Sequence, residues 1–306
     1  MSLSSYRESL LKKGLWFCVQ EASKRILPLR WVNSRAAMEL LFEERAFRYL
    51  KRRYQPLLKD YRPTDEPANE PSRVIWVCWL QGEENAPDLV KRCIASMRQH
   101  AGGYEVRVVT NENLRSYVTI PDYITHALKK RRMQFATYSD YIRMALLAKH
   151  GGIWIDATVL LTAPVPEELL SSPLFVFQNS PVATSPLFGS SWFIVSKANN
   201  EIVQQAKYLF ECYWQREKKL CHYYLFHMLL TLVFLYNEAN VRCLRKMPYI
   251  SNAEVHLLQR ELFEPYDAQR FNEICRRAFC HKLTYKTRNK ALLQREDTNY
   301  QYILKN

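Results

Sequence analysis

The residues best suited to chemistry lie in one short segment, residues 139–158. Within it, Asp156 follows residues 153–155, a short apolar run that is typical of a buried strand. In open α/β sheets, ligands bind at the carboxyl ends of the strands. A carboxylate there can hold Mg²⁺ or Mn²⁺ through oxygen, and the ion can bridge substrate phosphates. This pattern predicts a divalent ion and a phosphate-bearing ligand beside Asp156.

Two adjacent glycines precede this strand. The chain has only seven glycines, so the pair Gly151 and Gly152 is informative. Glycine permits the left-handed turn that ends a helix, and it lets a ligand approach the backbone closely. The sequence therefore predicts a helix that stops at this pair, and it places Gly152 among the ligand-binding positions.

Asp140 and Arg143 lie one helix earlier and are three residues apart, so they share a helix face. That face could present an acceptor for sugar hydroxyls beside a guanidinium that binds phosphate or ribose oxygens. The alternative is an ordinary ion pair within the helix. Both interpretations stay open on the sequence alone.

The elements that must position these residues alternate between strand and helix patterns. Strands are expected at residues 74–79, 105–110, 153–155, 174–178 and 192–195. Helices are expected at residues 86–99, 114–132 with a break at Pro121, 136–149, 199–217, 222–237, 254–263 and 267–279. The alternation favours a parallel α/β sheet, which the helical C-terminal third would cover or flank.

The first 70 residues are predicted to be a helical extension followed by a linker, because residues 61–72 hold three prolines and few apolar side chains. Residues 71–306 would then form the main domain. The extension could lie on an anionic membrane or a partner, or it could simply pack on the main domain.

Taken together, the string SDYIRMALLAKHGGIWIDATVLL resembles the Asp-x-x-Arg … Gly-Gly-x-Tyr-x-Asp-x-Asp block of glycosyltransferase family 32 (GT32), which includes capsular polysaccharide synthesis proteins. It is also similar to the glucosyltransferase domains of the large clostridial toxins. Further similar stretches follow the same order between residues 74 and 286: VIWVCWLQG, FVFQN, SSWFIVSKANN, LFHMLL and HKLTYK. The resemblance implies a GT-A fold, an α/β Rossmann-like sheet that binds a nucleotide sugar, with additional helices at both ends.

The resemblance also implies roles for individual residues. The donor site would comprise Trp79, Gln81 and Gly82 at the base, Asp140 and Arg143 at the sugar and phosphates, Trp154, and Lys282 and Lys286 at the diphosphate. Asp156 would be the first acid of the metal-binding Asp-x-Asp motif. Thr158 replaces the second acid and is a weaker, neutral ligand, so His281 is the candidate to complete the metal shell, with a surface position as the alternative. Asn179, Ser191 and Trp192 could face the acceptor, or could be turn and core residues.

The predicted reaction transfers a sugar from a nucleotide-sugar donor, expected to be a UDP-sugar, to a hydroxyl of a capsular or other cell-surface glycan. The resemblance implies retention of anomeric configuration and dependence on Mn²⁺ or Mg²⁺. The alternative is a non-catalytic protein that binds a sugar nucleotide or glycan and has lost the metal chemistry with the second acid.

The net charge of +14 suits phosphorylated donors, anionic or lipid-linked acceptors, or an anionic membrane surface. Nucleic acid would suit it too, but no nucleic-acid-binding motif is present, so no such partner is expected. The eight cysteines form no CxxC pair, no apolar run approaches the length of a membrane span, and no signal peptide is evident. These features predict a cytoplasmic protein with peripheral contact at the inner face of the membrane.

Overall fold

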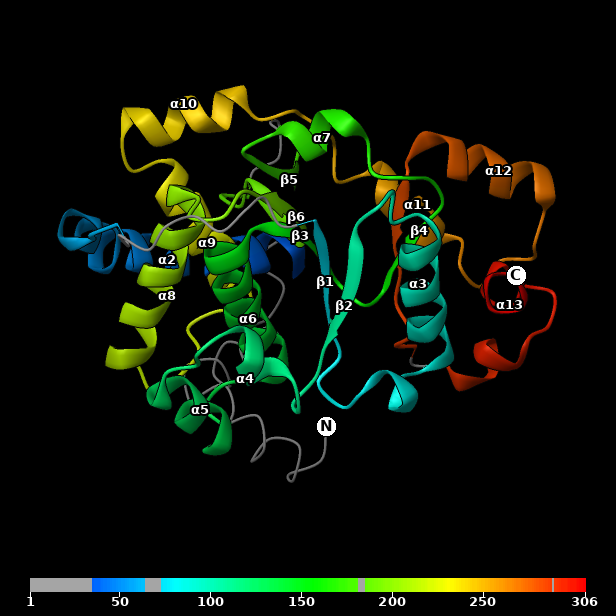
Figure 1. The fold of residues 1–306 in the computed structure, drawn as a ribbon, viewed down its shortest axis with the longest axis horizontal. Helices are drawn as coiled ribbons and strands as arrows, with labels where there is room; N and C mark the ends of the chain where they lie inside the picture. Colours follow the sequence, from blue (N-terminus) through cyan, green and yellow to red (C-terminus); the bar gives the residue numbers. More distant parts are fainter. Residues whose placement is uncertain (1–34, 64–72, 181–184, 288) are drawn as a thin grey trace.

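A five-stranded sheet forms the centre of the protein (Figure 1). The computed structural model describes residues 35–63, 73–180, 185–287 and 289–306. The strands of the sheet are β1 (Val74–Cys78), β2 (Glu105–Val109), β3 (Gly152–Ile155), β5 (Leu174–Gln178) and β6 (Gly189–Ser196). Their order across the sheet is β2-β1-β3-β6-β5. All five lie where the sequence predicts strands, which confirms the α/β class.

The prediction of a parallel sheet is only half right. Strands β2, β1 and β3 are parallel, whereas β6 is antiparallel to β3 and β5 is antiparallel to β6. Both β5 and β6 are almost wholly buried, and β5 and the middle of β6, residues 192–195, read as short apolar runs. Such runs are typical of parallel strands covered on both faces, so the residue pattern could not show the direction of these two strands.

Helices cover one face of the sheet, and a mixed layer covers the other (Figure 1). The first layer holds α6 (Phe135–His150) and α9 (Leu225–Phe234), with α8 (Glu201–Arg216) packed against both. The second holds α3 (Asp88–Gln99) and a two-stranded sheet of β4 (Val159–Leu161) and β7 (Cys280–Lys282). The sequence analysis missed β4 and β7, because three-residue strands are too short to show a period.

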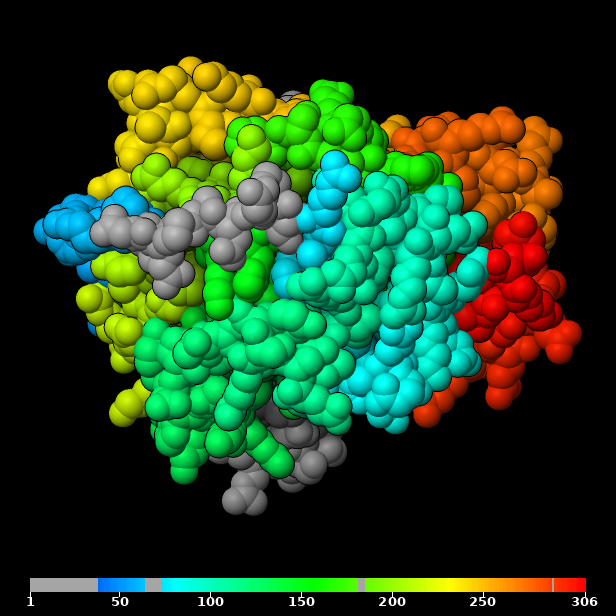
Figure 2. All heavy atoms as spheres, in the orientation of Figure 1, coloured from blue at the N-terminus to red at the C-terminus, as the bar shows by residue number. Residues whose placement is uncertain are grey.

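The remaining elements are mostly short. They are α4 (Leu114–Tyr117), α5 (Asp122–Lys129), α7 (Glu167–Ser171), α10 (Glu238–Lys246), α11 (Leu257–Arg260), α12 (Ala268–Arg277), α13 (Asn299–Lys305) and the 3₁₀ turns η1 (Gln55–Asp60), η2 (Glu83–Asn85), η3 (Glu254–His256) and η4 (Lys290–Gln294). Polar caps start several helices: Asn200 accepts from two backbone N–H groups of α8, and Asp267 accepts from Arg270 in α12. The C-terminal elements lie along the flank of α3 (Figure 2), where Arg92 donates to the Ile303 carbonyl at 3.1 Å.

The described part of the N-terminal extension belongs to the same core. Helix α2 (Arg35–Arg53) leads into η1, and Leu50, Tyr54 and Leu58 are buried against the main body. The Tyr49 and Tyr54 hydroxyls both donate to the carboxylate of Glu217, at 2.5 and 2.8 Å. Of the two interpretations of the extension, its described part therefore follows the second, packing on the main domain. Residues 1–34 and 64–72 lie outside the described residues.

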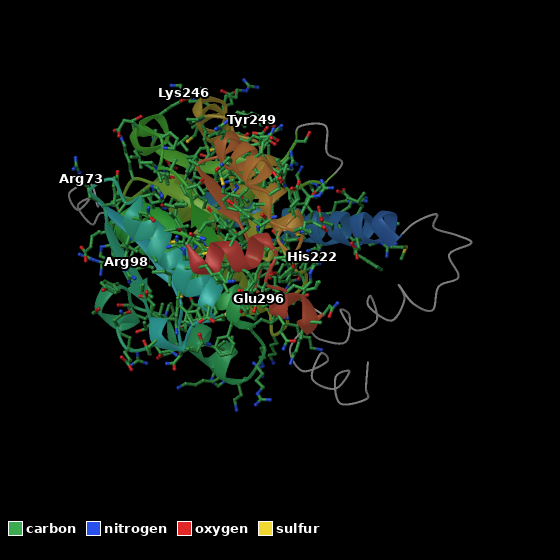
Figure 3. The ribbon with its side chains drawn as sticks, turned by 90° about the vertical axis from the view of Figure 1, so that its right-hand side faces the viewer. Arg73, Arg98, His222, Lys246, Tyr249 and Glu296 are labelled. Carbon is green, nitrogen blue, oxygen red and sulfur yellow. The ribbon has the colours of Figure 1, made fainter. Side chains whose placement is uncertain are left out.

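Charged side chains are distributed over the outside of the protein. Arg73, Arg98, Lys246 and Glu296 project from different parts of the chain (Figure 3). Several surface charges are paired, as in the contact of Arg98 with Glu83 at 2.6 Å. Over the described ranges, no helix is both long enough and apolar enough to cross a bilayer.

Candidate active site

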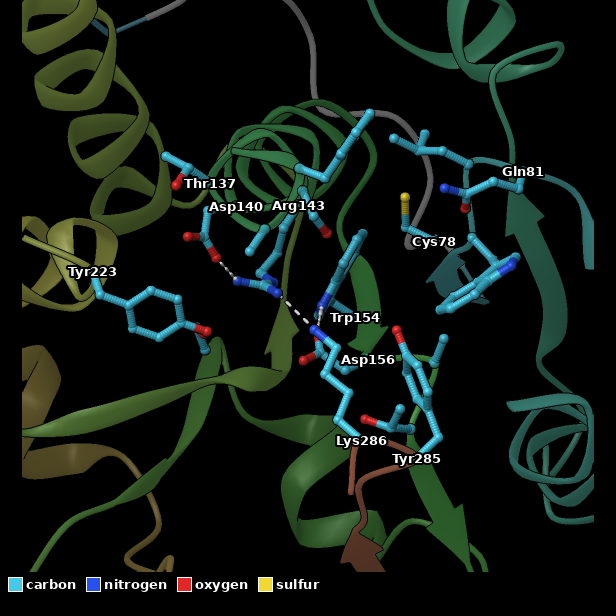
Figure 4. A pocket seen from close by; sticks show the side chains of 18 of the residues that line it. Cys78, Gln81, Thr137, Asp140, Arg143, Trp154, Asp156, Tyr223, Tyr285 and Lys286 are labelled. Atoms are coloured by element: carbon cyan, nitrogen blue, oxygen red, sulfur yellow. Dashed lines mark hydrogen bonds and ion pairs between the residues drawn. The ribbon is translucent and has the colours of Figure 1, made fainter. Parts of the chain in front are cut away.

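A cleft of about 450 Å³ opens at the carboxyl ends of β1 and β3 (Figure 4). Residues 78–81 after β1 and residues 156–158 after β3 form two of its walls. The first turns of α6 form a third wall, and Tyr285 and Lys286, which follow β7, form a fourth. The cleft thus lies at the edge of the parallel strands where the sequence predicted a ligand site.

Arg143 links two carboxylates that line this cleft. It is only 3% exposed, and its guanidinium bonds to two carboxylates. One Nη donates to Asp140 on the same helix, and the other donates to Oδ1 of Asp156 at 2.7 Å. The guanidinium carbon also lies 4.8 Å from the ring centroid of Trp154. The Asp140–Arg143 pair is therefore an ion pair within the helix, as the second interpretation has it. Both residues also line the cleft, and their role toward a ligand stays a prediction.

Asp156 is held by more than Arg143. Oδ1 also accepts from Nε1 of Trp154 at 2.9 Å, and Oδ2 accepts from Nζ of Lys282 at 2.8 Å. The same Lys282 ammonium donates to the Thr158 hydroxyl at 2.8 Å. The Asp156 side chain keeps 26% of its surface exposed and lines the cleft. Asp156 thus lines the ligand site while its two oxygens are already bonded to two cations.

The two carboxylates differ in pKa because their surroundings differ. Burial and the nearby charge of Asp156 raise the pKa of Asp140 to about 6, although Arg143 opposes the change. Burial alone would raise the pKa of Asp156 as well. The charges of Lys282 and Arg143, with hydrogen bonds from Lys282 and Trp154, outweigh burial there and lower the pKa to about 2.

Strand pairing brings Lys282 to this position. In the β4–β7 ladder, Lys282 pairs with Val159 and His281 pairs with Leu160. The backbone N–H of Leu283 extends the contact by donating to the Thr158 carbonyl at 2.8 Å. Neighbouring side chains on a strand point to opposite faces, so Lys282 reaches Asp156 and His281 does not.

His281 is accordingly a correction to the sequence analysis. It is fully buried, and its Nε2 lies 3.2 Å from the Thr162 hydroxyl on the other side of the small sheet. Burial lowers the pKa of His281 to about 4. Its position suits neither the metal shell beside Asp156 nor the surface site that was the alternative.

The oxygen ligands that remain do not fit a divalent ion. Asp156 and Thr158 are the two side chains that the motif offers, and Lys282 is bonded to both. Within the described residues, no group of three His, Cys, Asp or Glu side chains is arranged to hold a metal ion. An ion placed at Asp156 would have to displace the ammonium of Lys282 and would then face the guanidinium of Arg143. The prediction of Mn²⁺ or Mg²⁺ therefore rests on the sequence pattern and the resemblance alone.

The two predicted site glycines, Gly82 and Gly152, lie outside the cleft lining and allow special backbone conformations. Gly152 starts β3 with φ of 96°, at the opposite end of that strand from Asp156. Gly151 before it ends α6 with φ of 66°, and a Cβ there would lie 2.4 Å from the backbone nitrogen of Ala198. Gly82 is buried with φ of 88°, and it closes a turn by donating to the Trp79 carbonyl. Their conformations explain why glycine is needed at these positions.

The predicted acceptor residues divide in the same way. Ser191 lines the cleft, whereas Asn179 and Trp192 are outside its lining. Asn179 donates to the Leu187 carbonyl at 2.9 Å and accepts from Asn252. Trp192 stacks on Phe177 with ring centroids 4.7 Å apart. These two residues support a loop and the core.

Of the predicted donor-site residues, Trp79, Gln81, Asp140, Arg143, Trp154 and Lys286 line the cleft, and Lys282 reaches it through Asp156. Among the lining side chains that the sequence analysis missed are Tyr223, His227 and Tyr285. Tyr285 meets Trp79 edge to face, with centroids 5.9 Å apart. It lies inside the HKLTYK stretch, so that stretch was the one signal for it.

His227 belongs to the stretch of residues 222–237 that the sequence predicts to be a helix. It does lie on α9, but it also lines the cleft, and its Nδ1 has no hydrogen-bond partner within the described part of the chain. Burial and the nearby Arg143 lower the pKa of His227 to about 3, so the ring is neutral at physiological pH. A neutral ring nitrogen of this kind can bond a ligand hydroxyl.

The fold and the cleft define an α/β protein whose site is suited to a phosphorylated, hydroxyl-rich ligand. Residues 28–303 match the family model described as capsular polysaccharide synthesis protein. The chain belongs to this glycosyltransferase-like family, as the sequence resemblance suggested. Its inclusion in family 32 stays a prediction.

Two curated proteins match part of the chain. The O-glycosyltransferase PaGT of Phomopsis amygdali is 29% identical over 123 residues, which are 37% of this chain and 29% of that protein. Subversion of eukaryotic traffic protein A of Legionella pneumophila is 26% identical over 109 residues, 36% of this chain and 17% of that protein. The matched region thus spans less than a third of the length of either relative.

Among solved structures, the PaToxG glycosyltransferase aligns with 87% of this chain and 96% of its own, at 14% identity. The TM-score is 0.41, which is too low to carry an argument about the site.

Proposed function

We propose that this protein transfers a sugar from a nucleotide sugar, a UDP-sugar by resemblance, to a hydroxyl of a capsular or other cell-surface glycan. One observation carries the proposal. In a member of a capsular polysaccharide synthesis family, Asp140, Arg143 and Asp156 are bonded into one cluster that lines a cleft at the carboxyl ends of parallel strands.

The side chains around the cluster suit the parts of such a donor. Trp79 and Tyr285 come from two walls of the cleft and offer two aromatic rings that meet edge to face, and aromatic rings stack on bases. Asp140 and the neutral His227 offer acceptors for sugar hydroxyls. Lys286 lines the cleft as an exposed cation that can reach the diphosphate. Arg143 is nearly buried and bonded to both carboxylates, so we assign it the positioning of those carboxylates.

In the proposed reaction, the bond between C1 of the sugar and the diphosphate oxygen breaks, and its electron pair stays on the leaving nucleoside diphosphate. The acceptor hydroxyl oxygen forms the new bond to C1, and its proton passes to an oxygen of the departing diphosphate. This route suits retention of configuration and needs no base from the protein. Fixed cations near the diphosphate would stabilise the negative charge that develops on it.

Fewer residues can be assigned to the acceptor side of the cleft than to the donor side. Ser191 is the one predicted acceptor residue in the lining. The net charge of +14 would favour an anionic or lipid-linked glycan, and it would favour peripheral contact with an anionic membrane surface.

The test is donor turnover by the full chain. Purified protein is incubated with UDP-, GDP-, CDP- and ADP-sugars, and release of free nucleoside diphosphate is measured with and without a capsular oligosaccharide. We expect one donor class to turn over and Asp156→Asn to abolish that turnover. Asp297→Asn is the matched control, because Asp297 is 60% exposed and pairs with surface Arg295.

Binding of a nucleotide sugar without any turnover would overturn the enzymatic proposal and favour the non-catalytic alternative. Activity that survives in Asp156→Asn would show that the chemistry lies elsewhere.

A further inference from the structure

Lys282 occupies the place that the sequence motif reserves for a metal ion. Its Nζ lies 2.8 Å from Oδ2 of Asp156 and 2.8 Å from the hydroxyl of Thr158. These are the first and third residues of the Asp-Ala-Thr segment, and they are the two that would ligate a cation. The side chain of Lys282 is 19% exposed, and it meets the cleft through its bonds to Asp156 and Thr158, which both line it.

The charges around this position are already balanced. Two carboxylates, Asp140 and Asp156, are bonded to two cations, Arg143 and Lys282. The neutral Thr158 hydroxyl accepts from Lys282, where a second acid would leave an excess negative charge. The neutral threonine at position 158 therefore suits the lysine that reaches it from β7, because the total charge of the cluster stays near zero.

The lysine is held in place by backbone pairing as well as by its own bonds. Lys282 is the last residue of β7, whose ladder with β4 begins directly after Thr158. The hydrogen bond from Leu283 to the Thr158 carbonyl locks the two segments together at 2.8 Å. The ammonium is thus preorganised beside Asp156 before any ligand binds.

Building on the proposed function, we propose that the Lys282 ammonium replaces the divalent ion and that this protein binds the diphosphate of its donor without metal. An ammonium has three N–H donors. Two of them are used on Asp156 and Thr158, which leaves the third for a diphosphate oxygen. Lys286, four residues further along and in the cleft lining, supplies a second cation for the same group.

The first experiment measures binding, so it does not depend on turnover. The full chain is titrated calorimetrically with UDP, GDP, CDP and ADP, once with Mn²⁺ and once with EDTA. We expect one nucleotide to bind with the same affinity in both conditions. Binding that appears only with Mn²⁺ would overturn the inference and leave the proposed function standing. Absence of binding in both conditions would refute the proposed function itself.

Substitutions then test the lysine. Lys282→Met should weaken nucleotide binding in EDTA by roughly tenfold or more, since a charge-assisted hydrogen bond is lost. Lys282→Arg keeps the charge and should retain most of the affinity. Lys246→Met is the matched control, because Lys246 is exposed at the outer edge of the protein (Figure 3). Unchanged binding in a folded Lys282→Met variant would contradict the assignment.

A variant that gains metal binding provides a further test, because a misfolded protein would not show this gain. The double variant Lys282→Met, Thr158→Asp removes the ammonium and restores the second acid of the motif. We expect Mn²⁺ to raise the melting temperature of this double variant and to restore its nucleotide binding, while Mn²⁺ leaves the wild-type melting temperature unchanged. A wild-type protein stabilised by Mn²⁺ as strongly as the double variant would refute the replacement of metal by lysine.

Discussion

Asparagine should have opposite effects on stability at the two carboxylates that Arg143 joins. At Asp140, the pKa of about 6 lies roughly two pH units above the ordinary value of 3.8, so ionised Asp140 is disfavoured in the folded protein by about 3 kcal/mol at pH 7. Asp140→Asn mimics the neutral side chain. The free energy of unfolding should therefore stay unchanged or increase by at most about 3 kcal/mol.

At Asp156, asparagine should lower the free energy of unfolding instead. The pKa of about 2 lies roughly two pH units below the ordinary value, which corresponds to a stabilisation of about 2–3 kcal/mol. Asp156→Asn also leaves Arg143 and Lys282 with one fewer anion in a mostly buried cluster. Removing one partner of a buried ion pair costs about 3–5 kcal/mol, so we expect a loss of about 3 kcal/mol.

Urea denaturation at pH 7 measures both variants in one assay, and the slope m checks that the unfolding transition stays comparable. Each substitution replaces one carboxylate oxygen by nitrogen, so each variant controls for the size change in the other. Equal losses at the two positions, or a larger loss at Asp140, would refute the electrostatic reasoning.

Three further outcomes are expected. Because the pKa of Asp140 is raised, its contribution to stability is present below about pH 4 and is lost as pH rises toward 6. The urea concentration at the midpoint of unfolding should therefore fall over that pH range in the wild type and not in Asp140→Asn. Gly151→Ala should cost more than Gly102→Ala in thermal unfolding: both glycines have positive φ, but a Cβ meets backbone at 2.4 Å only at Gly151, while Gly102 carries just the left-handed strain of about 1–2 kcal/mol. Trp79→Leu should weaken nucleotide binding by about 1–3 kcal/mol in calorimetry through lost stacking, and unchanged affinity would remove the base from that wall.

Local sequence patterns were sufficient to predict the strands and most of the helices. Apolar runs such as residues 74–78, and punctuation by proline and glycine, located elements within a few residues. Strand direction could not be predicted for β5 and β6, since it depends on the path of the chain between them. The two short strands β4 and β7 could not be predicted, because three residues are too few to show a residue pattern.

The cluster at Asp156 was predictable only on the side that is local in sequence. Asp140, Arg143 and Asp156 lie within 17 residues of chain and could be grouped from their spacing. Lys282 is 126 residues away from Asp156, and no local pattern specifies that pairing. The sequence analysis chose His281 as the metal ligand, one residue from the side chain that reaches Asp156. On a strand, an error of one residue selects the opposite face.

The attachment of α2 bears on where the folding unit begins. The proline-containing stretch before β1 invites a boundary near residue 71, yet Leu50, Tyr54 and Leu58 fill space inside the main body. A chain started at that boundary would leave an apolar surface open and would leave Glu217 without its two tyrosine donors. We therefore expect the autonomous folding unit to begin before residue 71 and to include α2.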